Sequence, residues 1–124
     1  MTRKQACKFL DWCQRQLGLE DWILELFVQN ALPEWATPED HDTPQPLGLC
    51  ATNRPYKTAK IWVSPAKCEA DDSCPYSALG HEMMHVSAVD TGMESDIGSQ
   101  PSHEFLWNKL GDLLAAHYAQ LRKE

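Results

Sequence analysis

One short motif constrains the fold of this 124-residue chain more than any other feature of its sequence. His81, Glu82 and His85 form the pattern H-E-x-x-H. Residues four apart lie one turn apart on the same face of an α-helix, so a helix here lets both imidazoles reach one metal ion. Glu82 is turned about 100° around that helix from His81, where it can reach a water on the metal. The motif therefore predicts a helix that carries two metal ligands and one general base.

A third ligand has to come from elsewhere in the chain. A catalytic zinc site usually takes three protein ligands and leaves the fourth position for water. One zinc-peptidase pattern places a histidine six residues after the second histidine, behind a glycine, but these positions hold Thr91 and Ala88. Glu104 and His103, at the start of the next predicted helix, remain as candidates. Neighbouring helical residues point about 100° apart, so only one of the two is expected to face the metal.

The spacing of these residues resembles that of the gluzincin metallopeptidases, which include thermolysin-like and aminopeptidase N-like enzymes. In this chain residues 86–103 separate the H-E-x-x-H motif from Glu104. The resemblance implies that Glu104 is the third ligand of one Zn²⁺ per chain, with His103 as the alternative third ligand. It also implies a zinc peptidase in which Glu82 is the catalytic base.

Two further roles follow from the same resemblance. In thermolysin-like members an acidic residue four positions after the glutamate ligand supports the first histidine, and here that position holds Asn108. An amide can accept the same hydrogen bond, so Asn108 is the expected supporting residue. The short chain looks more like the minimal single-domain gluzincins of microbes and phages. In zincins an edge strand before the active-site helix pairs with extended substrate, which implies this role for Ile61, Trp62 and Val63.

The rest of the sequence predicts one α+β domain over residues 1–124. The expected elements are helices over 3–17, from an N-cap at Ser73 to about Asp90 and from about Ser102 onward, and strands over 21–29, 47–53 and 56–64. Gly18 and Gly92 are expected to end the first two helices. Residues 66–72 are expected to be loop. The expected fold is minimal and zincin-like, a small, mostly antiparallel sheet with an N-terminal, an active-site and a C-terminal helix.

Composition excludes several classes of partner. The net charge is −7, whereas proteins that bind nucleic acid are usually basic because phosphate neutralisation supplies much of their affinity. This acidity also disfavours a DNA-associated SprT-like protease, which shares H-E-x-x-H. The chain has no apolar run of about 20 residues and no apolar leader segment, so we expect neither a membrane span nor export from the cytoplasm. The expected partner is a peptide or protein substrate, not nucleic acid or a membrane.

Two alternatives to an active peptidase stay open at the level of sequence. The zinc could be structural, in a binding or interaction module where Glu82 is idle. The chain could also be a latent zymogen plugged by the loop over residues 30–47 or by a cysteine thiolate, for which Cys50, Cys68 and Cys74 are candidates. Cys68 and Cys74 bracket a short acidic loop, and they could also pair with each other or bind metal.

The donor that would stabilise an oxyanion is the least constrained part of the site. Related enzymes use a tyrosine or a histidine, and the candidates here are Tyr56, Tyr76, His117 and Tyr118. At 1.5 Å per residue, Tyr118 would lie about 20 Å from Glu104 along one straight helix, too far to serve. We expect these four residues to be structural.

Overall fold

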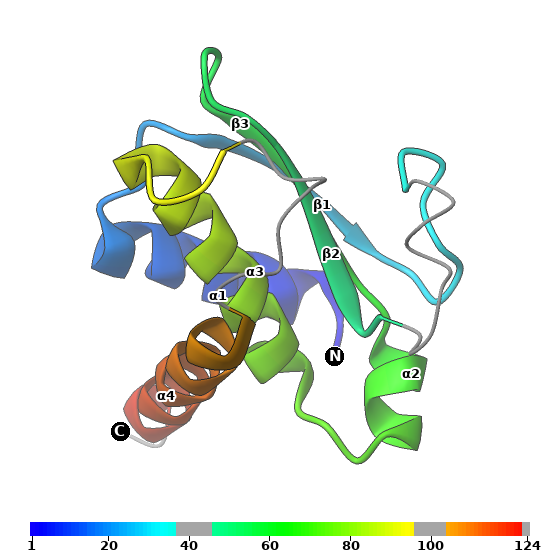
Figure 1. Cartoon of the computed structure of the whole chain (residues 1–124). Coiled ribbons are helices and arrows are strands. Elements are labelled where there is room, and N and C mark those ends of the chain that lie inside the picture. Colours follow the sequence, from blue (N-terminus) through cyan, green and yellow to red (C-terminus); the bar gives the residue numbers. More distant parts are fainter. Residues whose placement is uncertain (37–45, 96–103, 123–124) are drawn as a thin grey trace.

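The computed structural model describes residues 1–36, 46–95 and 104–122. Its elements are α1 (Arg3–Leu17), β1 (Ile23–Val28), β2 (Gly48–Asn53), β3 (Thr58–Val63), α2 (Pro65–Ala70), α3 (Pro75–Thr91) and α4 (Glu104–Arg122). Figure 1 shows α1 and α3 on one side of the sheet, with α4 packed against α3. The α+β class predicted from the sequence is confirmed. No helix in the described ranges combines the length and apolar character needed to cross a membrane.

The three strands form a mixed sheet in the order β1-β3-β2. Ile61 of β3 lies opposite Cys50 in an antiparallel pair with β2 and opposite Leu26 in a parallel pair with β1. The central strand is therefore β3, where Ile61, Trp62 and Val63 are fully buried. The edge-strand role predicted for these three residues is wrong, because both sides of their backbone are already paired. Within the described residues, the edges of the sheet are β1 and β2.

One apolar cluster joins the sheet to the helices that cover it. Residues at helical spacing supply the helical side of the cluster, namely Ala6, Phe9, Leu10 and Cys13 of α1 and Leu79, Met83, Val86 and Val89 of α3. Burial raises the pKa of the Cys13 thiol to about 12, so this cysteine is a core residue and not a reactive one. The apolar faces of α1 and α3 thus fix both helices against the same side of the sheet.

Glycines end α1 and α3 as predicted. Gly18 and Gly92 have φ values of 68° and 84°, a left-handed conformation that strains any residue with a side chain. At the start of α3, Cys74 occupies the cap position in place of the predicted Ser73, and its side chain makes no capping hydrogen bond.

A short helix occupies part of the segment predicted to be loop. The α2 helix begins where Oγ of Ser64 accepts a hydrogen bond from the backbone N–H of Lys67, at 3.2 Å. Pro65 follows in the first turn, where its missing N–H costs nothing. The Ser-Pro pair therefore both ends β3 and starts α2, so the prediction of loop over residues 66–72 is wrong for most of that segment.

The crossing of α3 and α4 brings two glycines into direct contact. A Cβ atom on Gly80 would lie 2.8 Å from the backbone oxygen of Gly111, and one on Gly111 would lie 2.6 Å from the backbone nitrogen of His81. Both distances are shorter than real Cβ contacts, so the two helix backbones touch at this point. This contact sets how closely the first turns of α4 approach the motif on α3.

We expect the change Gly111→Ala to destabilise the protein by about 1–3 kcal/mol, because the added methyl group pushes α4 away from α3. In an open helix the same change stabilises by up to about 1 kcal/mol. Urea unfolding followed by circular dichroism would measure the effect. The control is Ala116→Gly at an exposed position of α4, which gives the intrinsic helix propensity term alone. A Gly111→Ala variant more stable than the wild type would contradict the close crossing.

Candidate metal centre

The helix α3 places the two histidines of the motif side by side. Nε2 of His81 lies 3.2 Å from Nε2 of His85. Two nitrogen ligands of a tetrahedral zinc ion lie about 3.3 Å apart, given zinc–nitrogen bonds of about 2.0–2.1 Å. The two imidazoles are therefore already spaced to bind one ion.

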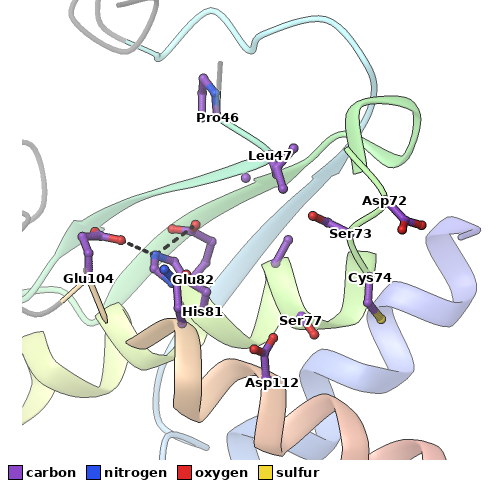
Figure 2. Close-up of a pocket in the computed structure, with 13 residues that line it drawn as sticks. Pro46, Leu47, Asp72, Ser73, Cys74, Ser77, His81, Glu82, Glu104 and Asp112 are labelled. Atoms are coloured by element: carbon purple, nitrogen blue, oxygen red, sulfur yellow. Dashed lines mark ion pairs between the residues drawn. The ribbon is translucent and has the colours of Figure 1, made fainter. Parts of the chain in front are cut away.

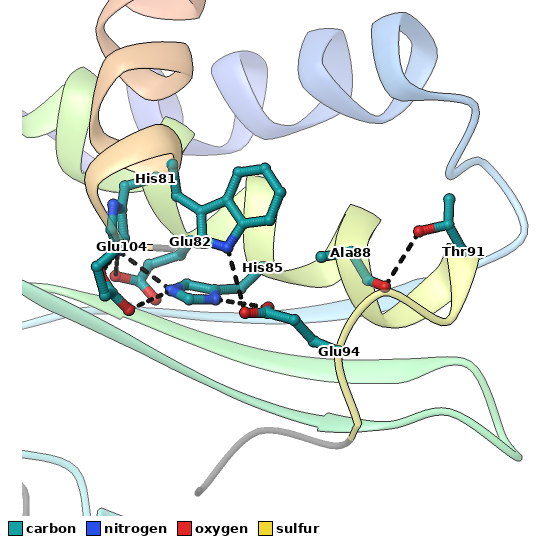
Figure 3. Close-up of polar contacts among 8 residues, drawn as sticks. His81, Glu82, His85, Ala88, Thr91, Glu94 and Glu104 are labelled. Carbon is teal, nitrogen blue, oxygen red and sulfur yellow. Dashed lines mark hydrogen bonds and ion pairs between the residues drawn. The ribbon is translucent and has the colours of Figure 1, made fainter. Parts of the chain in front are cut away.

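The first turn of α4 brings a carboxylate to the same point. Oε2 of Glu104 lies 2.7 Å from Nε2 of His81, and Oε1 lies 2.8 Å from Nε2 of His85 (Figure 3). The ligand atoms of the three side chains all lie within 4.8 Å of one another, so this group could hold a metal ion. The alternative third ligand, His103, lies outside the described residues.

The charges at this centre favour a bound cation. Partial burial opposes ionisation of Glu104, but the hydrogen bonds from the two imidazoles outweigh it and lower its pKa to about 2. Burial also disfavours the charged form of His85, yet its hydrogen bond to Glu104 and the nearby carboxylates raise its pKa to about 9. Positive charge is thus stabilised here, and a metal ion could supply it in place of a proton.

Glu82 lies beside the three candidate ligands and not among them. Its Oε2 is 4.0 Å from Nε2 of His81, and the residue is only 7% exposed. Burial raises the pKa of Glu82, which makes its carboxylate a stronger base than an exposed one. The thiol of Cys50, on β2, donates a hydrogen bond to this carboxylate. Glu82 therefore lies where a general base is expected, and it is positioned both by α3, which carries it, and by its contact with Cys50 of β2.

A buried acid that the sequence analysis missed orients the second histidine. Oε1 of Glu94 lies 2.9 Å from Nδ1 of His85 (Figure 3), and Nε1 of Trp107 donates to the other carboxylate oxygen at 3.2 Å. Glu94 itself is 7% exposed. A carboxylate that accepts the Nδ1 proton fixes the tautomer of a histidine and directs its Nε2 lone pair at the metal.

The supporting role predicted for Asn108 is wrong. Among the described residues, Nδ1 of His81 has no hydrogen-bond partner. Asn108 is exposed and lies in the wall of a cavity, one turn along α4 from Glu104. The structure instead supports the second histidine, His85, through Glu94.

The centre opens into a cavity of about 780 Å³ (Figure 2), within the size range of small-molecule sites. The cavity runs between the start of β2, the segment that leads into α3, and α4. Its lining residues are Pro46, Leu47, Gly48, Asp72, Ser73, Cys74, Ser77, Ala78, His81, Glu82, Glu104, Asn108 and Asp112. His81, Glu82 and Glu104 therefore lie where a ligand can reach them.

None of the four candidate oxyanion donors lines this cavity. The rings of Tyr76 and Tyr118 pack against Phe9 at centroid distances of 5.2 and 5.1 Å. His117 packs against a tryptophan of α1, and Tyr56 is 78% exposed. These residues have the structural positions expected for them.

The three cysteines considered as plugs are free thiols and do not belong to the ligand group. Cys50 contacts Glu82 from the sheet, Cys68 is fully buried in α2, and Cys74 lines the cavity. The segment from 37 to 45, which makes up half of the candidate plug loop over residues 30–47, lies outside the described residues.

No family model matches this chain, and neither a curated protein nor a solved structure matches it.

If Glu94 orients His85, the change Glu94→Gln should weaken zinc affinity about 10–100-fold, since removing the group that supports a metal-binding histidine has this effect. Competition with a coloured zinc chelator measures the affinity, and thermal unfolding of the metal-free variant checks that the fold survives. The matched control is Asn108→Ala, which should change zinc affinity little. Equal losses in the two variants would contradict the assignment of Glu94.

Proposed function

We propose that this chain is a zinc-dependent peptidase of the gluzincin type. The observation that carries the proposal is the convergence of His81, His85 and Glu104 at one point in the wall of a cavity, which His81, Glu104 and the neighbouring Glu82 line. Two imidazoles and one carboxylate make up the ligand set of many catalytic zinc sites, which keep a fourth position for water. Structural zinc sites usually have four protein ligands, whereas the group found among the described residues has three.

In the proposed hydrolysis, Glu82 and Glu94 have separate roles beside the zinc ion. When bound, zinc supplies a Lewis acid that lowers the pKa of water towards about 7 and polarises a carbonyl oxygen. Glu82 is placed to take the proton from the attacking water and to return it to the leaving amine, since it is buried beside the ligands. Glu94 holds His85 in the orientation that binding requires.

In this proposal β2 takes the role that the sequence suggested for β3. Within the described part of the chain β2 pairs only with β3, which leaves its other edge free. Leu47 and Gly48, at the start of this strand, line the cavity together with Glu82. An extended peptide can pair with a free strand edge through its main chain, whatever its side chains. This arrangement supports a peptide or protein as the substrate.

We expect the purified chain to bind one zinc ion and to cleave an unfolded protein such as casein. The change Glu82→Gln should keep the zinc but slow cleavage at least about 100-fold, because it removes the base and leaves the ligands. His85→Ala should lose the zinc itself. Elemental analysis and release of labelled peptides measure the two effects, and Glu69→Gln, an exposed change on α2, is the matched control.

The outcomes separate the proposal from its alternative. Zinc binding together with cleavage that is unchanged in Glu82→Gln, or absent from the wild type, would favour a structural or latent zinc module. A wild-type chain that binds no zinc after supply of the metal and removal of the excess would overturn the proposal.

A further inference from the structure

The connection between α2 and α3 carries two cysteines that the proposed mechanism does not use. Cys68 is fully buried in α2, whereas Cys74 is exposed and occupies the cap position of α3. Both are free thiols. In a reducing compartment such cysteines stay reduced, and a disulfide between them would be transient and responsive to oxidants.

The backbone between the two cysteines folds back on itself. The N–H of Asp72 donates to the carbonyl of Glu69 at 3.1 Å, and the N–H of Ser73 donates to the carbonyl of Cys68 at 2.8 Å. Asp72 has a left-handed backbone, with φ of 56°. These features make up a Schellman motif, which reverses the chain over the last turn of a helix. Cys74 therefore follows directly after the point where the chain returns to Cys68.

The two thiols differ in their access to solvent. Burial raises the pKa of Cys68, so its thiol does not react directly with a dissolved oxidant. Cys74 is the exposed member of the pair and so is the one that a dissolved oxidant can reach.

We propose that Cys68 and Cys74 are a modification site that forms a reversible intramolecular disulfide on reaction with a peroxide. The sulfur of Cys74 attacks one peroxide oxygen, the O–O bond breaks, and a sulfenic acid and water result. The sulfur of Cys68 then attacks the sulfur of Cys74, the S–S bond forms, and a second water leaves. The two thiols together lose two electrons and two protons to the peroxide. A dithiol reductant reverses the reaction.

A disulfide between Cys68 and Cys74 would change the wall of the cavity, because Cys74 is one of its lining residues. Figure 2 shows Cys74 in the cavity wall, close to Ser73 and at the start of the helix that carries His81. Withdrawal of Cys74 towards Cys68 changes that wall without removing a metal ligand. Oxidation should therefore slow peptide cleavage and leave the zinc in place, a consequence that rests on the proposed function.

The test treats the zinc-loaded full chain with hydrogen peroxide and maps its disulfides without reduction. Trypsin is unsuitable, because no lysine or arginine separates the two cysteines, but Glu69, Asp71 and Asp72 do. A protease that cuts at acidic residues should give two peptides that stay joined until a reductant is added. Cys74→Ser should abolish the joined pair, whereas Cys7→Ser, at an exposed position of α1, should retain it.

The disulfide is read from peptide mass, so its failure is distinct from failure of the peptidase proposal. Joined peptides that persist in Cys74→Ser, or a disulfide-linked dimer in place of the internal bond, would overturn the assignment. The cavity consequence is supported if oxidation slows casein cleavage reversibly at unchanged zinc content, with no such change in Cys74→Ser. Cleavage that is equal before and after full oxidation would overturn that part alone.

Discussion

The candidate centre depends on the contact between the backbones of α3 and α4. The motif on α3 provides two candidate ligand nitrogens, and the third candidate ligand comes from a helix that begins well after it along the chain. Helices with ordinary side chains at their contact pack about 8–10 Å apart. Gly80 and Gly111 remove the side chains at the crossing, so the first turn of α4 comes near enough for Glu104 to reach both histidines.

The same small volume holds more negative charge than apolar surroundings usually accept. Glu82 and Glu94 are buried, and Glu104 is half-buried between the imidazoles. Buried carboxylates are unfavourable unless they are hydrogen-bonded or paired with positive charge. Hydrogen bonds from Trp107 to Glu94 and from Cys50 to Glu82 offset part of the cost of burying these carboxylates. A bound cation would offset the rest, which is a physical reason for acids to surround a cation here.

The sequence was sufficient for those parts of the fold and site that depend on local pattern. Helical spacing predicted α1 and the motif helix, and glycines marked where α1 and α3 end. The spacing between the motif and Glu104 also identified the carboxylate that lies against both histidines. Each of these features is encoded within one element or in the distance along the chain between two elements.

The errors concern contacts that local pattern does not encode. The order of strands in a sheet depends on contacts between residues far apart in the sequence. The apolar sequence Ile61–Val63 therefore does not indicate whether its strand is central or at an edge of the sheet. The role of Glu94 was missed because an acid in a glycine-containing segment normally lies in solvent. In the structure the Glu94 carboxylate is buried and contacts the side chains of His85 and Trp107. Asn108 had the right spacing from Glu104, but its side chain lies in the cavity wall.

The way α4 is attached has a consequence for substitutions at the helix crossing. One end of the helix packs through Tyr118 against Phe9, and the other end carries the candidate ligand Glu104. Gly111 lies between them, at the crossing with α3. A larger residue at Gly111 would therefore shift Glu104 relative to the two histidines, so the geometry of the centre depends on a residue that supplies no ligand atom.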